Sequence, residues 1–255
     1  MGWDTSNSIS LGAAVISTIS FTIAYLTYRQ KNKESERSLK GQLTDSVKKL
    51  DDVFAEWDKL VYEQKGKSPD QYYIGRRSFL NGQKRFLAKQ ALYLMSSAPE
   101  LVSDFEYNRV ADAFSSIGDF EKANSLYLQA IETADEEYYK AICLRAYARS
   151  LFGQGDFEKG RQYFQKSIDT ATKDTNVNLY SKAETYQRWA SVEFENEFPD
   201  NAKQKILEAR RFYSKIPTPR NRQQGLQHLF ELEKNMFPTV DKLPAANIDI
   251  ADSGA

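Results

Sequence analysis

The stretch GDFEKANSLYLQAI (Gly118–Ile131) recurs as GDFEKGRQYFQKSI (Gly155–Ile168). The first five residues of the two copies are identical, and the copies begin 37 residues apart. Internal repetition with a period of about 20 to 50 residues is typical of stacked helical pairs. The low content of turn-forming residues, 12 Gly and 7 Pro in 255 residues, also favours long helices over many short strands. The sequence therefore predicts an all-α protein built from antiparallel helix pairs.

The composition excludes several classes of protein. The chain carries 35 Lys and Arg against 35 Asp and Glu, and this zero net charge argues against nucleic acid as a partner. Cys143 is the only cysteine and His228 the only histidine, so neither an internal disulfide framework nor a Cys/His zinc site can form. The sequence also lacks a glycine-rich phosphate loop, an HExxH motif and a GxSxG motif. We therefore expect no cofactor, no metal and no enzymatic activity.

The apolar residues around the two copies follow one order. In each copy, a helix with apolar, small and aromatic residues precedes a glycine turn, and a second helix with aromatic and small residues follows it. The residues in these positions are Tyr107, Val110, Ala111, Phe114, Gly118, Phe120, Ala123, Tyr127 and Ala130 in the first copy, and Leu144, Tyr147, Ala148, Leu151, Gly155, Phe157, Gly160, Phe164 and Ser167 in the second. This pattern resembles the tetratricopeptide repeat family, whose period is roughly 34 residues. The resemblance implies an α-solenoid.

A third repeat follows with a weaker pattern. The small and apolar positions are kept, but Glu193 stands where an aromatic residue is expected and Pro199 replaces the leading aromatic residue of the second helix. The stretch Asn221–Met236 has the apolar content of a capping helix, which solenoids need at their ends. We therefore predict repeats with a cap over residues 99–236 and a disordered tail over residues 237–255, which has almost no aromatic content.

The N-terminal region contains an apolar stretch, Ser8–Tyr28, and no charged residue occurs between Asp4 and Arg29. About 20 such residues in a helix span a bilayer core. Since the basic residues follow this stretch, the positive-inside rule places the N-terminus outside and the C-terminal domain in the cytoplasm. The sequence thus predicts a single-pass transmembrane anchor over residues 1–28 and a basic juxtamembrane stalk over residues 29–40. One alternative is a cleaved signal peptide, although its charge would precede the apolar run, and another is a buried helix of a soluble protein.

Small residues form one face of this apolar stretch, at alternating steps of three and four. Such faces let transmembrane helices approach closely, which indicates a partner helix or self-association. Alternatively, the Ser and Thr side chains bond back to their own helix. The predicted packing residues are Ser10, Ala13, Ser17, Ser20 and Ala24.

Residues 41–98 are predicted to form a helical hairpin that packs on the repeats. Large apolar residues between Leu39 and Val61 recur at steps of three and four, which marks one helix face. This face could continue the anchor as a coiled coil. However, Phe54 and Trp57 are bulky for a two-stranded seam, so we favour packing in the core.

The resemblance also implies a binding surface, because the first helices of successive tetratricopeptide repeats line a concave groove that accepts a segment of a partner. Arg145 and Arg149 are one helical turn apart and could grip a carboxylate, which predicts an acidic element in the partner. Alternatively, these arginines are solvated or pair with Asp112 and Glu184. The matching positions predict that the groove is lined by Asn108, Asp112, Arg145, Arg149 and Gln187.

These features together predict a membrane-tethered, tetratricopeptide-like module that recruits or scaffolds a partner protein. Tethering would raise the effective concentration of the module near the bilayer. The alternative is a self-assembling structural subunit, a homo-oligomer that uses the transmembrane and stalk helices to form a membrane complex.

Overall fold

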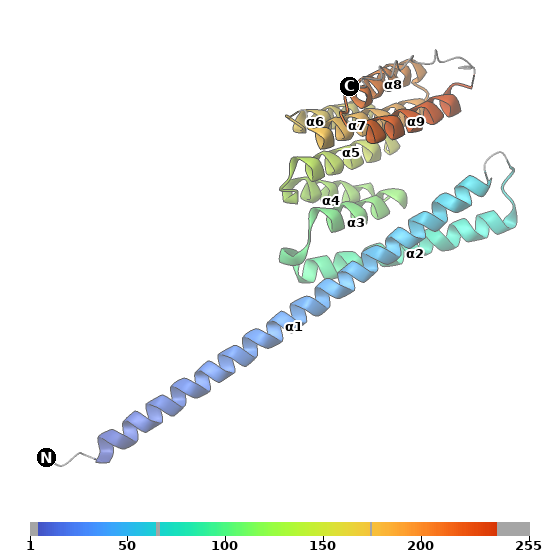
Figure 1. Cartoon of the computed structure of the whole chain (residues 1–255). Helices are drawn as coiled ribbons and strands as arrows, with labels where there is room; N and C mark the ends of the chain where they lie inside the picture. Colours follow the sequence, from blue (N-terminus) through green and yellow to red (C-terminus); the bar gives the residue numbers. More distant parts are fainter. Residues whose placement is uncertain (1–4, 65–66, 174, 239–255) are drawn as a thin grey trace, which may run out of the picture. The chain divides into compact units, whose positions relative to one another are not determined.

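We describe the fold from a computed structural model, which describes residues 5–64, 67–173 and 175–238, with side chains from residue 25 onward. The described chain contains α-helices and one short 3-10 helix, Pro99–Leu101, and no strand (Figure 1). The all-helical class predicted from the sequence therefore fits the structure. The helices are α1 (Thr5–Gln64), α2 (Gln71–Ser97), α3 (Asp104–Ser116), α4 (Phe120–Thr133), α5 (Glu137–Gly153), α6 (Phe157–Thr170), α7 (Asn176–Glu195), α8 (Pro199–Ser214) and α9 (Pro219–Met236).

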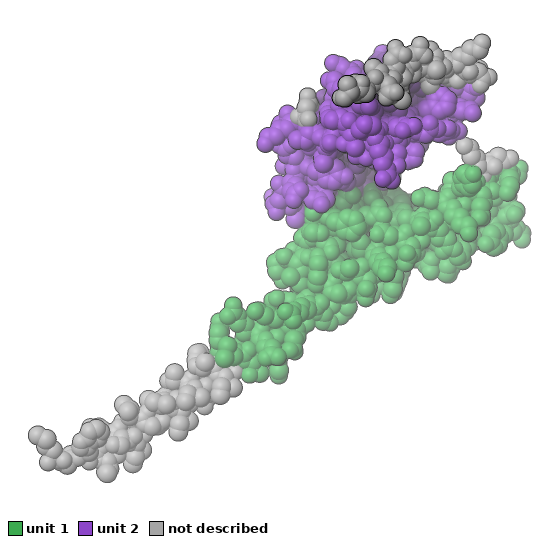
Figure 2. All heavy atoms as spheres, in the orientation of Figure 1, with its two compact units in different colours: residues 1–126 green, residues 127–255 purple. Residues whose placement is uncertain are grey.

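The chain divides into two compact units, Met1–Leu126 and Tyr127–Ala255, coloured green and purple in Figure 2. In the first unit, α1 and α2 lie side by side as a helical hairpin (Figure 1), and α3 packs on both of them. Buried leucines on the two helices, including Leu43, Leu50, Leu80 and Leu87, form the core of the hairpin.

Charged groups connect α3 to α1 in this unit. The amine of Lys40 donates to Glu106 at 2.6 Å, and Arg109 Nε donates to Asp51 at 2.6 Å. Glu106 also accepts a hydrogen bond from the backbone N–H of Ser103, which caps the start of α3. Burial alone raises the pKa of Glu106, but the hydrogen bonds from Lys40 and Ser103 outweigh it and hold the pKa below its usual value.

The second unit contains helical pairs packed in sequence. α5 packs on α6 and α7, α7 packs on α8, and α9 packs on α8 and α7. One buried cluster between α5, α6 and α7 contains Phe152, Phe164 and Trp189, and a second between α7, α8 and α9 contains Ile206, Tyr213 and Leu229. This repeat-like packing is compatible with an α-solenoid.

The turns between paired helices explain the repeated glycines. Gly118 and Gly155 both have φ of 81°, in the left-handed region that favours glycine. Glu197 takes the corresponding position in the third pair with φ of 66°, although it has a side chain. Phe198, the residue before Pro199, packs its ring on Phe157 at 5.2 Å between centroids. An aromatic residue is thus present at this turn, one residue earlier than the repeat pattern predicts.

The predicted fold class also included an N-terminal transmembrane helix, and that part of the prediction is wrong. In the described part of the chain, no helix is long and apolar enough to cross a membrane. α1 is one helix of 60 residues. From Arg29 onward it carries charged residues in nearly every turn, which a hydrocarbon interior would not accommodate. Residues 29–40, the predicted juxtamembrane stalk, are part of this same helix.

Two further predictions concern residues that the structure does not describe. The side chains predicted to pack a transmembrane helix, those of Ser10, Ala13, Ser17, Ser20 and Ala24, lie outside the described residues, and so does the tail from residue 239 onward. The location of the C-terminal domain in the cytoplasm stays a prediction.

Candidate functional site

The face shared by α5 and α7 holds three of the predicted groove residues, beginning with Arg145. This arginine is only 7% exposed, and its Nη1 donates to Glu184 Oε2 of α7 at 3.1 Å. Burial lowers the pKa of Arg145, the charge of Glu184 partly offsets this effect, and the charge of Arg188 lowers the pKa further. The pairing with Glu184 that we considered as the alternative therefore occurs at Arg145, whose guanidinium is not exposed for a partner.

Arg149, the second arginine of the predicted pair, is exposed one turn further along α5. Its charge acts on Glu195 of α7, where it opposes the rise in pKa that burial causes in that carboxyl. Arg188 of α7 is also exposed, and its charge acts on Arg145 of α5. The charges of Arg149 and Arg188 thus act across the contact between α5 and α7, on a face that also carries Glu184 and Glu195.

Gln187 of α7 is held by a neighbouring helix. Its Oε1 accepts a hydrogen bond from the hydroxyl of Tyr213 on α8 at 2.8 Å. Burial raises the pKa of Tyr213, so this phenol stays protonated and acts as the donor at neutral pH. The hydrogen bond fixes the orientation of the Gln187 amide and leaves its NH₂ group as the part that could meet a ligand.

Asn108 and Asp112, the other two predicted groove residues, lie on α3 in the first unit, and both are buried. Asp112 is within 3.4 Å of Arg109 on its own helix. Asn108 Oδ1 is a buried acceptor without a hydrogen-bond partner among the described residues. The predicted site residues are therefore divided between the two units. Whether they bind a partner stays a prediction.

Glu193 plays a part that the sequence pattern did not predict. Its side chain is fully buried, and its carboxylate accepts hydrogen bonds from Arg161 Nε and Nη2 and from Trp189 Nε1, each at 2.8 Å. Burial alone raises its pKa, but these bonds and that of Asn201 hold the pKa below its usual value. In the sequence, the only sign of this role was that Glu193 stands where the repeat pattern has an aromatic residue. The bidentate arginine partner on α6 could not be found without the fold.

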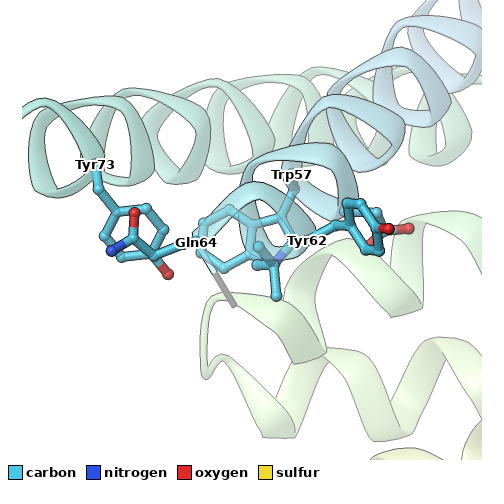
Figure 3. A pocket seen from close by; sticks show the side chains of 6 residues that line it. Trp57, Tyr62, Gln64 and Tyr73 are labelled. Carbon is cyan, nitrogen blue, oxygen red and sulfur yellow. The ribbon is translucent and has the colours of Figure 1, made fainter. Parts of the chain in front are cut away.

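The hairpin of the first unit has a hollow near its tip. It has a volume of about 590 Å³ and is lined by aromatic and polar side chains. Figure 3 shows Trp57, Tyr62 and Gln64 of α1 and Tyr73 of α2 around it. Its lining does not combine the nucleophile, base and orienting group that catalysis needs. Across the described residues, no group of three or more His, Cys, Asp or Glu could hold a metal ion.

Comparisons with protein-family models, curated proteins and solved structures gave no match to this chain. The resemblance to the tetratricopeptide repeats therefore rests on the residues of the sequence itself.

Proposed function

We propose that this chain is a tetratricopeptide-like helical-repeat protein that binds a partner protein through the face of α5 and α7, and so recruits or scaffolds that partner. The observation that carries this proposal is the exposure of Arg149 and Arg188 on two helices that pack together. Helical repeats commonly use such stacked first helices as extended binding surfaces.

The chemistry of this face indicates an acidic segment in the partner. Arginine recognises carboxylates through a planar fork of donors. Arg145 contributes indirectly, because its ion pair with Glu184 holds α5 against α7.

The test is affinity capture with the full-length protein and a matched pair of charge-reversal variants. Arg149→Glu with Arg188→Glu should reduce the captured partner about tenfold or more, because it places negative charge where acidic residues would bind. The control is Arg211→Glu with Arg220→Glu, which changes the charge equally at exposed arginines of α8 and α9. Arg145 is left intact because its burial would make a substitution destabilising. Equal capture by the two double variants would contradict the proposed face.

A further inference from the structure

A line of exposed aromatic residues runs along α2. Tyr72, Phe79, Phe86 and Tyr93 recur every seven residues and are 73%, 52%, 67% and 71% exposed. Seven residues are close to two helical turns, so these side chains share one face of the helix. We call them the aromatic stripe. Single exposed aromatic residues are common on protein surfaces, but a continuous line of large ones marks an interaction site.

Two glycines lie on the same face as the aromatic stripe. Gly75 and Gly82 are each three or four residues from Phe79, and a Cβ atom at either position would meet nothing within 4 Å. Glycine in a helix interior is destabilising relative to alanine, and no close contact inside the hairpin requires it at these positions. The glycines leave gaps between the rings. Large residues alternating with gaps at a seven-residue period match a seam that receives another helix.

A groove beside Phe86 extends this surface toward α1. It has a volume of about 410 Å³, and its apolar lining is formed by Val53 of α1 and by Phe86 and Leu87 of α2. Asp52 and Glu56 of α1 form part of its polar lining, and Glu56 pairs with Arg76 of α2. An apolar pocket with a polar rim is the arrangement in which a large anchoring side chain of a partner contributes most to binding.

The charges of α2 indicate which kind of helix can bind there. α2 contains five basic residues and no acidic residue. Arg85 and Lys89 are exposed one turn apart, and helical spacing places them on the flank of the aromatic stripe away from the groove. A second copy of α2 would bring like charges together along the seam. A partner with acidic residues on the facing flank would instead form complementary pairs.

We propose that the aromatic stripe and its glycine gaps form a docking seam for an amphipathic helix of another protein, with apolar residues at a seven-residue repeat and acidic residues that meet Arg85 and Lys89. An anionic membrane could also attract aromatic and basic groups. However, binding to a lipid surface does not require a seven-residue register or glycine gaps between the rings. The seam belongs to the first unit and is distinct from the face of α5 and α7.

The probes that test this proposal are two synthetic helical peptides of about the length of α2. Both carry leucine at the first and fourth positions of each heptad, and they differ only at the flanking position that would face Arg85 and Lys89, which is glutamate in one peptide and lysine in the other. Binding to the full-length protein is measured by fluorescence anisotropy. We expect the glutamate peptide to bind at least about tenfold more tightly than the lysine peptide, with a preference that weakens in high salt.

Three variants connect the binding to the seam. Phe79→Ala with Phe86→Ala should weaken binding of the glutamate peptide about tenfold or more, whereas Phe105→Ala with Tyr139→Ala, at exposed aromatic residues outside α2, should leave it unchanged. Arg85→Glu with Lys89→Glu should reverse the preference between the peptides. All substituted side chains are exposed, so circular dichroism should show the same unfolding midpoint for each variant.

Several outcomes would overturn the docking seam. One is equal or undetectable binding of the two peptides, and another is no effect of the phenylalanine substitutions. A dimer of the chain that those substitutions dissociate would show that a second copy occupies the stripe, and phenylalanine-dependent binding to phosphatidylserine vesicles would show that lipid does. The Arg149→Glu with Arg188→Glu variant should bind the glutamate peptide normally, so failure of the proposed function and failure of the seam are distinguishable.

Discussion

At the scale of single residues, Lys84 of α2 combines burial with a positive charge. It is 1% exposed, and its Nζ lies 3.7 Å from the centre of the Trp57 ring. Burial lowers the pKa of Lys84, and the nearby negative charge of Asp58 only partly offsets this effect. The contact with the ring stabilises the cation, but the lowered pKa shows that the folded state disfavours the charge on balance.

The lowered pKa predicts a pH dependence of stability. Between the lowered folded-state pKa and the ordinary lysine pKa of 10.5, the unfolded chain binds more protons than the folded one, so the free energy of unfolding rises with pH in this interval. Below the folded-state pKa, Lys84 is charged in both states, and the full cost of burying its charge lowers the free energy of unfolding. Lys84→Met should therefore stabilise the protein at neutral pH by on the order of 1 kcal/mol, and the gain should shrink as the pH rises.

Urea unfolding of wild type and Lys84→Met at neutral and alkaline pH measures this difference. Lys89→Met, which removes an exposed amine of the same helix, is the matched control and should show little change. A variant less stable than wild type at neutral pH would mean that the contact with Trp57 outweighs the cost of burying the amine.

Residue roles were predictable from the sequence where they depend on local pattern and unpredictable where they depend on a partner far along the chain. The glycine turns at Gly118 and Gly155 were expected, and both have positive φ. The pairing of Arg145 with Glu184 was one alternative from the sequence, and its burial was not predicted, because the partner is 39 residues away on another helix. Glu193 was noticed as a departure, but its pairing with Arg161 required the packing of α6 against α7.

At the scale of helices, the crossing of α5 and α6 explains Gly160. Its helical position costs about 1 kcal/mol relative to alanine in propensity. A Cβ atom there would lie 2.5 Å from Phe152 Cδ2 and 3.2 Å from the carbonyl oxygen of Ala148. Phe152 is itself buried among Ala148, Phe164 and Trp189, so its ring cannot move aside freely. The glycine is therefore required by the close approach of the two helices.

Gly160→Ala should consequently destabilise the protein by about 1 kcal/mol, because overpacking costs roughly 1 to 3 kcal/mol and the gain in helix propensity offsets about 1 kcal/mol of that cost. The control is Gly41→Ala in α1, where a Cβ atom would meet nothing within 4 Å and only the propensity gain applies. Thermal unfolding should show a lower midpoint for the first variant and an equal or higher one for the second. A stabilised Gly160→Ala would refute the close crossing.

The helices of the repeats were easier to predict than α1. Turn residues between the repeat helices stop each helix locally, so their order follows from the sequence. Between Arg29 and Leu60 no proline occurs, and the only glycine is Gly41. The change from apolar to charged residues near Arg29 suggested a boundary between elements. However, this change affects which solvent the side chains prefer and does not interrupt the helical backbone. α1 therefore continues through it.

At the scale of the whole chain, each compact unit has its own packed interior. The first unit buries leucines of α1 and α2, including Leu50 and Leu80. The second unit stacks Phe164 on Trp189 at 5.4 Å and Trp189 on Tyr186 at 6.1 Å. In repeat proteins, stability depends on contacts between neighbouring elements, so separate interiors allow separate opening of the units.

Truncation of a core residue should therefore expose the amides of its own unit selectively. Trp189→Ala removes a buried ring that stacks with Phe164 and Tyr186 and should cost about 3 to 5 kcal/mol, which lowers the protection of amides in α5 to α9. Amides of α1 and α2 should keep their protection. Leu80→Ala, which empties a fully buried position in α2, should give the reverse pattern. Hydrogen exchange followed by mass spectrometry measures both, and an equal loss of protection in the two units would show that the chain opens as one cooperative structure instead.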